Sequence, residues 1–127
     1  MAGERILLVE DNPMNRRVAE FLLKAQGYIV DEARDGQEAL EMLKTIRPDL
    51  ILMDLQLPNL DGYTATKLIK QDSATKNIPV VALTAYAMSG DAERAREAGC
   101  EGYITKPIDP DKFSHAVAGY LKSRVRS

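Results

Sequence analysis

The sequence is short of the residues on which several common classes of protein depend. Its 127 residues include one cysteine, one histidine and no tryptophan. A single cysteine excludes an internal disulfide, and the amino terminus has no signal-peptide core, so we expect a cytoplasmic protein. No apolar run approaches the roughly 18 residues needed to cross a bilayer, so we expect no contact with a membrane.

The sequence also lacks an excess of charge of either sign. Its 17 Lys and Arg residues nearly balance 19 Asp and Glu residues, giving a formal net charge of -2. Because the basic residues form no patch, we expect no direct binding to DNA or RNA. The length suits one domain. We therefore expect a single domain over residues 1–127, with a core from about 5 to 121 and no output domain.

Neither the lone cysteine nor the lone histidine suggests catalysis. Cys100 follows Gly99 in an apparent turn between a helix and a strand, and no histidine is near it in the sequence. This setting favours a structural thiol. His115 lies two positions from Phe113, away from the apolar stripe of its helix, which predicts a solvated position.

Short apolar runs alternate with segments of helical period along the whole chain. The runs predict strands near residues 5–10, 28–33, 49–54, 79–84 and 102–105. The segments between and after them predict helices near residues 13–27, 39–46, 64–70, 89–98 and 110–121. This alternation is typical of an α/β protein with a parallel sheet covered on both faces.

Two of the predicted helices have distinctive patterns. In the first, Asn12 suits the N-cap and Gly27 the C-terminal end, and the apolar residues Val18, Phe21, Leu22 and Ala25 recur at helical spacing. We expect Val18 to face the core, although with Met14 it could instead form a docking surface. The fourth helix, starting near Ser89, has few large apolar residues, which predicts weak packing.

Polar residues follow four of the predicted strands. Glu10 and Asp11 end the first, Asp54 the third, Thr84 the fourth, and Lys106 follows the fifth. The carboxyl ends of parallel strands meet at one edge of the sheet, so these side chains should form one site. Three carboxylates suit Mg²⁺, with Mn²⁺ as a possible substitute. An ammonium and a hydroxyl are the groups that hold a phosphoryl group.

The ordered set of motifs resembles the receiver domain of two-component response regulators. The resemblance rests on Ile6 to Asn12, Asp49 to Asp54 with Leu57-Pro58 and Asp61-Gly62, Val80 to Ala85, and Tyr103 to Pro107. It spans Arg5 to Leu121 and is strongest to stand-alone receivers and to those fused to hybrid histidine kinases. It implies a flavodoxin-like (βα)5 fold, with strand order 2-1-3-4-5 and five helices on both faces of the sheet.

The resemblance also implies roles for the site residues. Asp54 would be the phosphoacceptor. Asp11 and Asp54 would bind Mg²⁺ directly, together with the backbone carbonyl of Gln56, while Glu10 would act through water. The phosphoryl-binding and switch residues would be Thr84, Ala85, Lys106 and Tyr103. The residues that tune the rate of dephosphorylation would be Gln56 and Tyr86.

The family implies protein partners. The donor would be a phosphohistidine on a sensor or hybrid histidine kinase, on a histidine phosphotransfer protein, or on both in turn. An unknown target protein would bind the surface of the fourth helix, fifth strand and fifth helix. The domain would not be an enzyme, although it would assist its own phosphorylation and dephosphorylation.

Two alternatives remain open in the sequence. The first is a Mg²⁺-dependent phosphohydrolase of the haloacid type, which normally needs a second aspartate where Gln56 stands. The second is a receiver excised from a larger hybrid histidine kinase. Within the receiver interpretation, the domain could pass its phosphoryl group onward or act as a terminal regulator.

Overall fold

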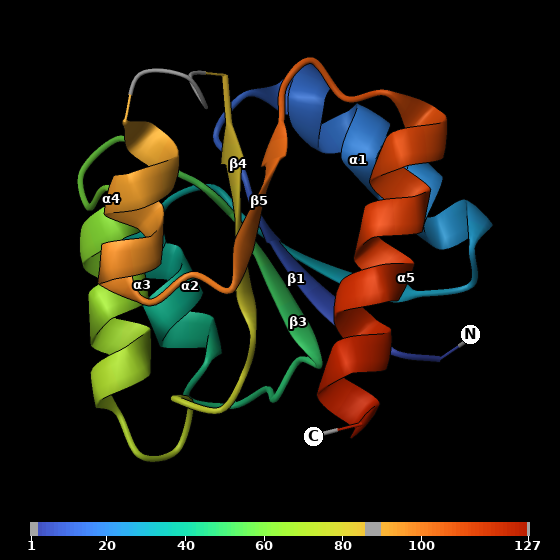
Figure 1. The fold of residues 1–127 in the computed structure, drawn as a ribbon. Helices are drawn as coiled ribbons and strands as arrows, with labels where there is room; N and C mark the ends of the chain where they lie inside the picture. The colour runs from blue at the N-terminus through green and yellow to red at the C-terminus, as the bar shows by residue number, and fades with distance from the viewer. Residues whose placement is uncertain (1–2, 86–89, 127) are drawn as a thin grey trace.

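The computed structural model describes residues 3–85 and 90–126, which form a five-stranded parallel sheet flanked by helices (Figure 1). The strands are β1 (Arg5–Val9), β2 (Ile29–Ala33), β3 (Leu50–Asp54), β4 (Val80–Thr84) and β5 (Gly102–Thr105). The helices are α1 (Pro13–Ala25), α2 (Gly36–Met42), α3 (Gly62–Gln71), α4 (Asp91–Ala98) and α5 (Pro110–Arg126). The strand order is β2-β1-β3-β4-β5, which confirms the predicted fold class and topology.

The helices lie in two layers, with α1 and α5 on one face of the sheet and α2, α3 and α4 on the other (Figure 1). Successive strand residues point to opposite faces, so each central strand supplies both layers. Leu7 and Ile51 pack with Ile69 of α3, whereas Ile6 and Leu50 belong to a second cluster under α1 and α5. This double cover explains why β3 is buried along its whole length.

Helix α1 begins and ends as predicted, but it is rotated relative to the expected core face. The side chain of Asn12 accepts hydrogen bonds from the backbone N–H groups of residues 14 and 15, and Gly27 has a φ of 90°. The prediction that Val18 faces the core is wrong, because Val18 is 43% exposed. Ala19 and Leu23 fill that place. The sheet-facing side of α1 therefore runs through Ala19 and Leu23, and Val18 lies outside it.

Helix α2 differs from expectation at both ends, whereas α4 has the small buried side chains that its sequence predicted; Ser89, the expected start of the fourth helix, lies outside the described residues. Helix α2 starts at Gly36, because the Asp35 side chain caps it by accepting from the backbone N–H of Glu38 at 2.8 Å. It ends at Met42, earlier than predicted. In α4 the buried side chains among those described are the small Ala95 and Ala98. In residues 3–85 and 90–126 no helix is long and apolar enough to span a membrane.

Candidate functional site

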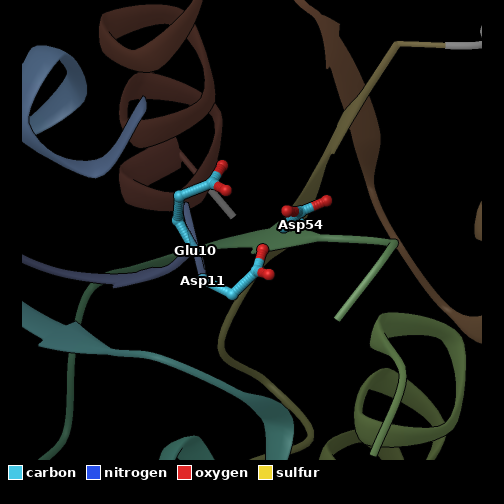
Figure 2. Close-up of side chains that lie close together, drawn as sticks. All are labelled: Glu10, Asp11 and Asp54. Atoms are coloured by element: carbon cyan, nitrogen blue, oxygen red, sulfur yellow. The ribbon is translucent and has the colours of Figure 1, made fainter. Parts of the chain in front are cut away.

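Three carboxylates meet at the carboxyl edge of the sheet. Glu10 and Asp11 follow β1, and Asp54 is the last residue of β3, the strand that pairs with β1. Each of the three residues offers a carboxylate oxygen, and these oxygens lie within 4.8 Å of one another (Figure 2). The structure therefore brings together the acids that the strand endings predicted.

Lys106 joins the same cluster from the end of β5. Its Nζ lies 2.9 Å from Oε1 of Glu10 and 3.1 Å from Oδ2 of Asp54. Both acids are buried, with 1% and 4% of their surface exposed, whereas Asp11 is exposed. One ammonium thus bridges the two buried carboxylates, while the third faces solvent.

Burial and charge act in opposite directions on the ionisation of this cluster. Burial raises the pKa of Glu10, and the negative charge of Asp54 adds to this, although Lys106 opposes both. Burial alone would lower the pKa of Lys106, but its hydrogen bond to Glu10 and the charge of Asp54 outweigh that effect and raise it. The ammonium group of Lys106 that contacts Glu10 and Asp54 is therefore charged at neutral pH.

Backbone amides fix the orientation of the two buried carboxylates. The N–H of Asn12 donates to Oε2 of Glu10 at 3.2 Å, and the N–H of Gln56 donates to Oδ1 of Asp54 at 3.0 Å. Asp54 therefore has one oxygen on a backbone amide and the other on Lys106. Gln56 itself is exposed. The role of its backbone carbonyl as a metal ligand stays a prediction.

The turn after β3 is shaped by Asp61-Gly62, which starts α3. The Asp61 side chain caps the helix by accepting from the N–H of Thr64 at 2.9 Å. Burial would raise the pKa of Asp61, but the hydrogen bonds from Thr64 lower it below its ordinary value. A Cβ on Gly62 would overlap the carbonyl oxygen of Asp54 and lie 2.7 Å from Cα of Leu55. Glycine therefore lets α3 begin directly against the end of β3.

The remaining predicted residues lie on the β4 and β5 side of the edge. Thr84 is buried at the end of β4, and its carbonyl accepts from the backbone N–H of Lys106 at 2.8 Å. Ala85 follows in an exposed bend, and the Lys106-Pro107 peptide is cis. Tyr103 is 41% exposed. Tyr86 lies outside the described residues.

The structure adds Arg16, which the sequence did not suggest. Arg16 lies in the first turn of α1. Its Nη1 donates a hydrogen bond to the backbone carbonyl of Glu10, at a distance of 3.0 Å. In the sequence, the one feature that could have indicated this contact is the position of Arg16, five residues after Asp11.

The donor set fits a small divalent cation. Mg²⁺ takes oxygen ligands, uses one or two carboxylates, and keeps several waters. Asp54 and Glu10 supply buried oxygens, and the exposed Asp11 leaves one side open to solvent. Among the described residues this is the one group of three or more acids, histidines or cysteines that meets at metal-binding distances.

Comparison with known proteins shows the family of the chain. The family model of the response regulator receiver domain matches residues 6–118. The chain is a member of the response regulator receiver domain family. It is 47% identical over 116 residues to the polar-differentiation response regulator DivK of Brucella anthropi, covering 91% of this chain and 94% of that protein.

Two solved structures show receivers with a metal. The receiver domain of the Pseudomonas aeruginosa sensor histidine kinase PA1611, with magnesium in its active-site cleft, is 40% identical, with a TM-score of 0.89 and 95% and 99% of the two chains covered. The Mn²⁺-bound response regulator Rcp1 is 34% identical, with a TM-score of 0.78 and 91% and 90% covered.

As a receiver domain, the chain acts in two-component signalling. The haloacid-type phosphohydrolase considered from the sequence has no support among these relatives.

Proposed function

We propose that this receiver domain accepts a phosphoryl group on Asp54 from a protein phosphohistidine, assisted by Mg²⁺ or Mn²⁺. One observation supports this most strongly. Asp54 lies at the end of a buried strand with Oδ2 3.1 Å from Nζ of Lys106, and its carboxylate lies within 4.8 Å of those of Glu10 and Asp11. Nucleophile, cation and metal donors thus occupy one edge of the sheet.

In the proposed transfer, an Asp54 carboxylate oxygen forms a bond to phosphorus as the bond from phosphorus to the histidine nitrogen breaks. The electron pair of that bond stays on the imidazole. Asp11, Asp54 and the carbonyl of Gln56 would hold the metal, with Glu10 acting through water, and the bound metal would neutralise charge on the phosphoryl oxygens. Lys106 is already charged and would move from the carboxylates to the phosphoryl group.

Phosphorylation would switch a neighbouring surface through charge. The acyl phosphate brings close to two extra negative charges to the site. Thr84, and Ala85 beside it, would turn to bind the phosphoryl oxygens, and Tyr103 would turn inward from its exposed position. Helix α4 buries small side chains, so it is the element of the α4, β5 and α5 surface that moves at least cost.

The partner surface in this proposal is the exposed side of α1. Met14 and Phe21 are each 71% exposed and Val18 is 43% exposed, and their spacing places them on one stripe. The stripe starts three residues after Asp11, next to the acidic site. Apolar stripes of this kind pack against helices, so a helical phosphohistidine domain of a kinase or phosphotransfer protein fits it.

A labelled transfer assay tests the phosphoacceptor. A histidine kinase or phosphotransfer protein carrying labelled phosphohistidine is mixed with wild type, with Asp54→Asn, and with the control Asp72→Asn, which removes an exposed acid outside the site. We expect label on wild type and on the control, and none on Asp54→Asn. Equal labelling of Asp54→Asn and wild type would contradict the assignment.

The same assay tests the docking surface. Phe21→Ser should slow transfer from the protein donor but leave the reaction with acetyl phosphate unchanged, because the small donor does not need the stripe. Leu68→Ser on α3, where Leu68 is 42% exposed, is the matched control and should slow neither reaction. If Phe21→Ser transfers at the wild-type rate, α1 is not the docking surface.

A further inference from the structure

Arg16 bonds the backbone of the turn that supplies two of the three acids. Its Nη1 lies 3.0 Å from the carbonyl oxygen of Glu10 and 3.5 Å from that of Asp11. Strand β1 ends at Val9, so these two carbonyls lie beyond the last strand residue. Backbone groups past the end of a strand need partners from elsewhere. Arg16 supplies one cation to both.

Glu32 on β2 holds the other side of the same guanidinium. Nε of Arg16 lies 3.6 Å from Oε1 of Glu32, and the Arg16 side chain is 19% exposed. The backbone N–H of Glu10 also donates to the carbonyl of Ala33 at 3.0 Å. The turn after β1 is therefore fixed to β2 twice, once through its amide and once through Arg16.

Lys106 and Arg16 contact different groups of the acidic residues: Lys106 contacts side-chain carboxylates, and Arg16 contacts backbone carbonyls. Lys106 bonds the carboxylates of Glu10 and Asp54, so it must give way when a phosphoryl group or a metal takes those oxygens. Arg16 bonds carbonyls, and its contacts can persist whatever the carboxylates bind. A planar guanidinium with several donors can serve two carbonyls and a carboxylate at once, which a lysine ammonium does less well.

We propose that Arg16 is a positioning residue that holds the turn of Glu10 and Asp11 in its metal-binding conformation, and that Glu32 orients Arg16. The metal-affinity part of this inference rests on the proposed function of the acidic cluster. The conformational part does not, because the contacts exist in the protein alone. Outer contacts that orient metal-binding groups typically change metal affinity by about 10–100-fold when removed.

Mg²⁺ titration by isothermal calorimetry tests the first part. Arg16→Gln should weaken Mg²⁺ binding about tenfold. Arg17→Gln is the matched control, because Arg17 is the exposed neighbour on the same turn and its loss removes the same charge; it should change the affinity less than about twofold, as expected for an exposed charge. Glu32→Gln should weaken binding by no more than about fivefold, since its pair with Arg16 is partly exposed.

A rate measurement separates positioning from a general loss of structure. The phosphorylation rate with acetyl phosphate is measured against Mg²⁺ concentration. Arg16→Gln should need more Mg²⁺ for half the maximal rate, and the maximal rate should return to within about twofold of wild type. Arg16→Lys keeps the charge, so the Mg²⁺ concentration that it needs for half the maximal rate should lie between those of wild type and Arg16→Gln. A variant that is merely unfolded in part would lose maximal rate at every Mg²⁺ concentration.

Amide hydrogen exchange in the metal-free protein tests the second part. The N–H of Asn12, which donates to Glu10, should exchange faster in Arg16→Gln than in Arg17→Gln. Wild-type Mg²⁺ affinity and wild-type exchange in Arg16→Gln would overturn the inference. If the wild-type protein itself binds no Mg²⁺, the proposed metal site fails, and the exchange result alone decides whether Arg16 positions the turn.

Discussion

Gly62→Ala should destabilise the protein, although alanine is the better helix former. Gly62 is the first residue of α3, and a Cβ there would overlap the carbonyl oxygen of Asp54 and lie 2.7 Å from Cα of Leu55. Both neighbours are backbone atoms of the strand end, so relief requires α3 or β3 to shift. A shift would also stretch the hydrogen bond from the Gly62 N–H to the Leu55 carbonyl, which is 3.2 Å long.

The opposing free energies can be compared. Forcing an extra methyl group into a packed site costs about 1–3 kcal/mol, and weakening the backbone hydrogen bond costs about 1 kcal/mol. Alanine gains at most about 1 kcal/mol over glycine in a helix. The free energy of unfolding should therefore fall by about 2 kcal/mol, which for a domain of this size lowers the Tm by roughly 8 °C.

The assay is urea unfolding followed by far-ultraviolet circular dichroism, since the chain has no tryptophan. Gly119→Ala is the matched control. Gly119 lies within α5, and a Cβ there would meet no atom within 4 Å outside its own helix turn. That variant should be more stable than wild type by about 0.5–1 kcal/mol. A Gly62→Ala protein as stable as wild type would refute the close approach between α3 and β3.

Three further results follow from side chains away from the site. Burial raises the pKa of the Cys100 thiol to about 11, so the folded state keeps this proton to higher pH than the unfolded chain does. The free energy of unfolding should therefore fall as pH rises from about 9 to 11, and Cys100→Ala should make that fall shallower, leaving the part due to groups such as Tyr28, whose pKa burial also raises. Lys70→Met should lower the free energy of unfolding by about 1.5–3 kcal/mol in urea, because Nζ donates to the carbonyl of Ile78 at 2.7 Å and to Glu101 at 2.9 Å; an unchanged midpoint would show that these bonds add nothing. Phe21→Ser should change stability by less than about 0.5 kcal/mol, since Phe21 is 71% exposed, and a larger loss would show that the α1 stripe packs within the chain.

The sequence predicted the sheet because the signal there is simple. Each central strand is covered on both faces, so it appears as an unbroken apolar run such as Leu50 to Met53. The polar residue that ends each run then marks the same edge. For this reason Asp54, Glu10 and Lys106 could be grouped before their distances were known.

The parts that the sequence predicted badly depend on rotation and on side-chain reach. Helix α1 has apolar residues on two sides. Their spacing alone did not show that Ala19 and Leu23 face the sheet and that Val18 does not. The contact of Arg16 with the Glu10 carbonyl depends on the same rotation. The start of α2 was missed because its cap, Asp35, precedes a glycine, which weakens the helical signal.

The central claim is that Asp54 is the phosphoacceptor of a metal-assisted site. The most direct measurement is the intact mass of the protein after incubation with acetyl phosphate and Mg²⁺, with Asp54→Asn and a metal-free sample treated in parallel. We expect wild type to gain the mass of one phosphoryl group, and neither Asp54→Asn nor the metal-free sample to gain it. The same gain in Asp54→Asn would contradict the account.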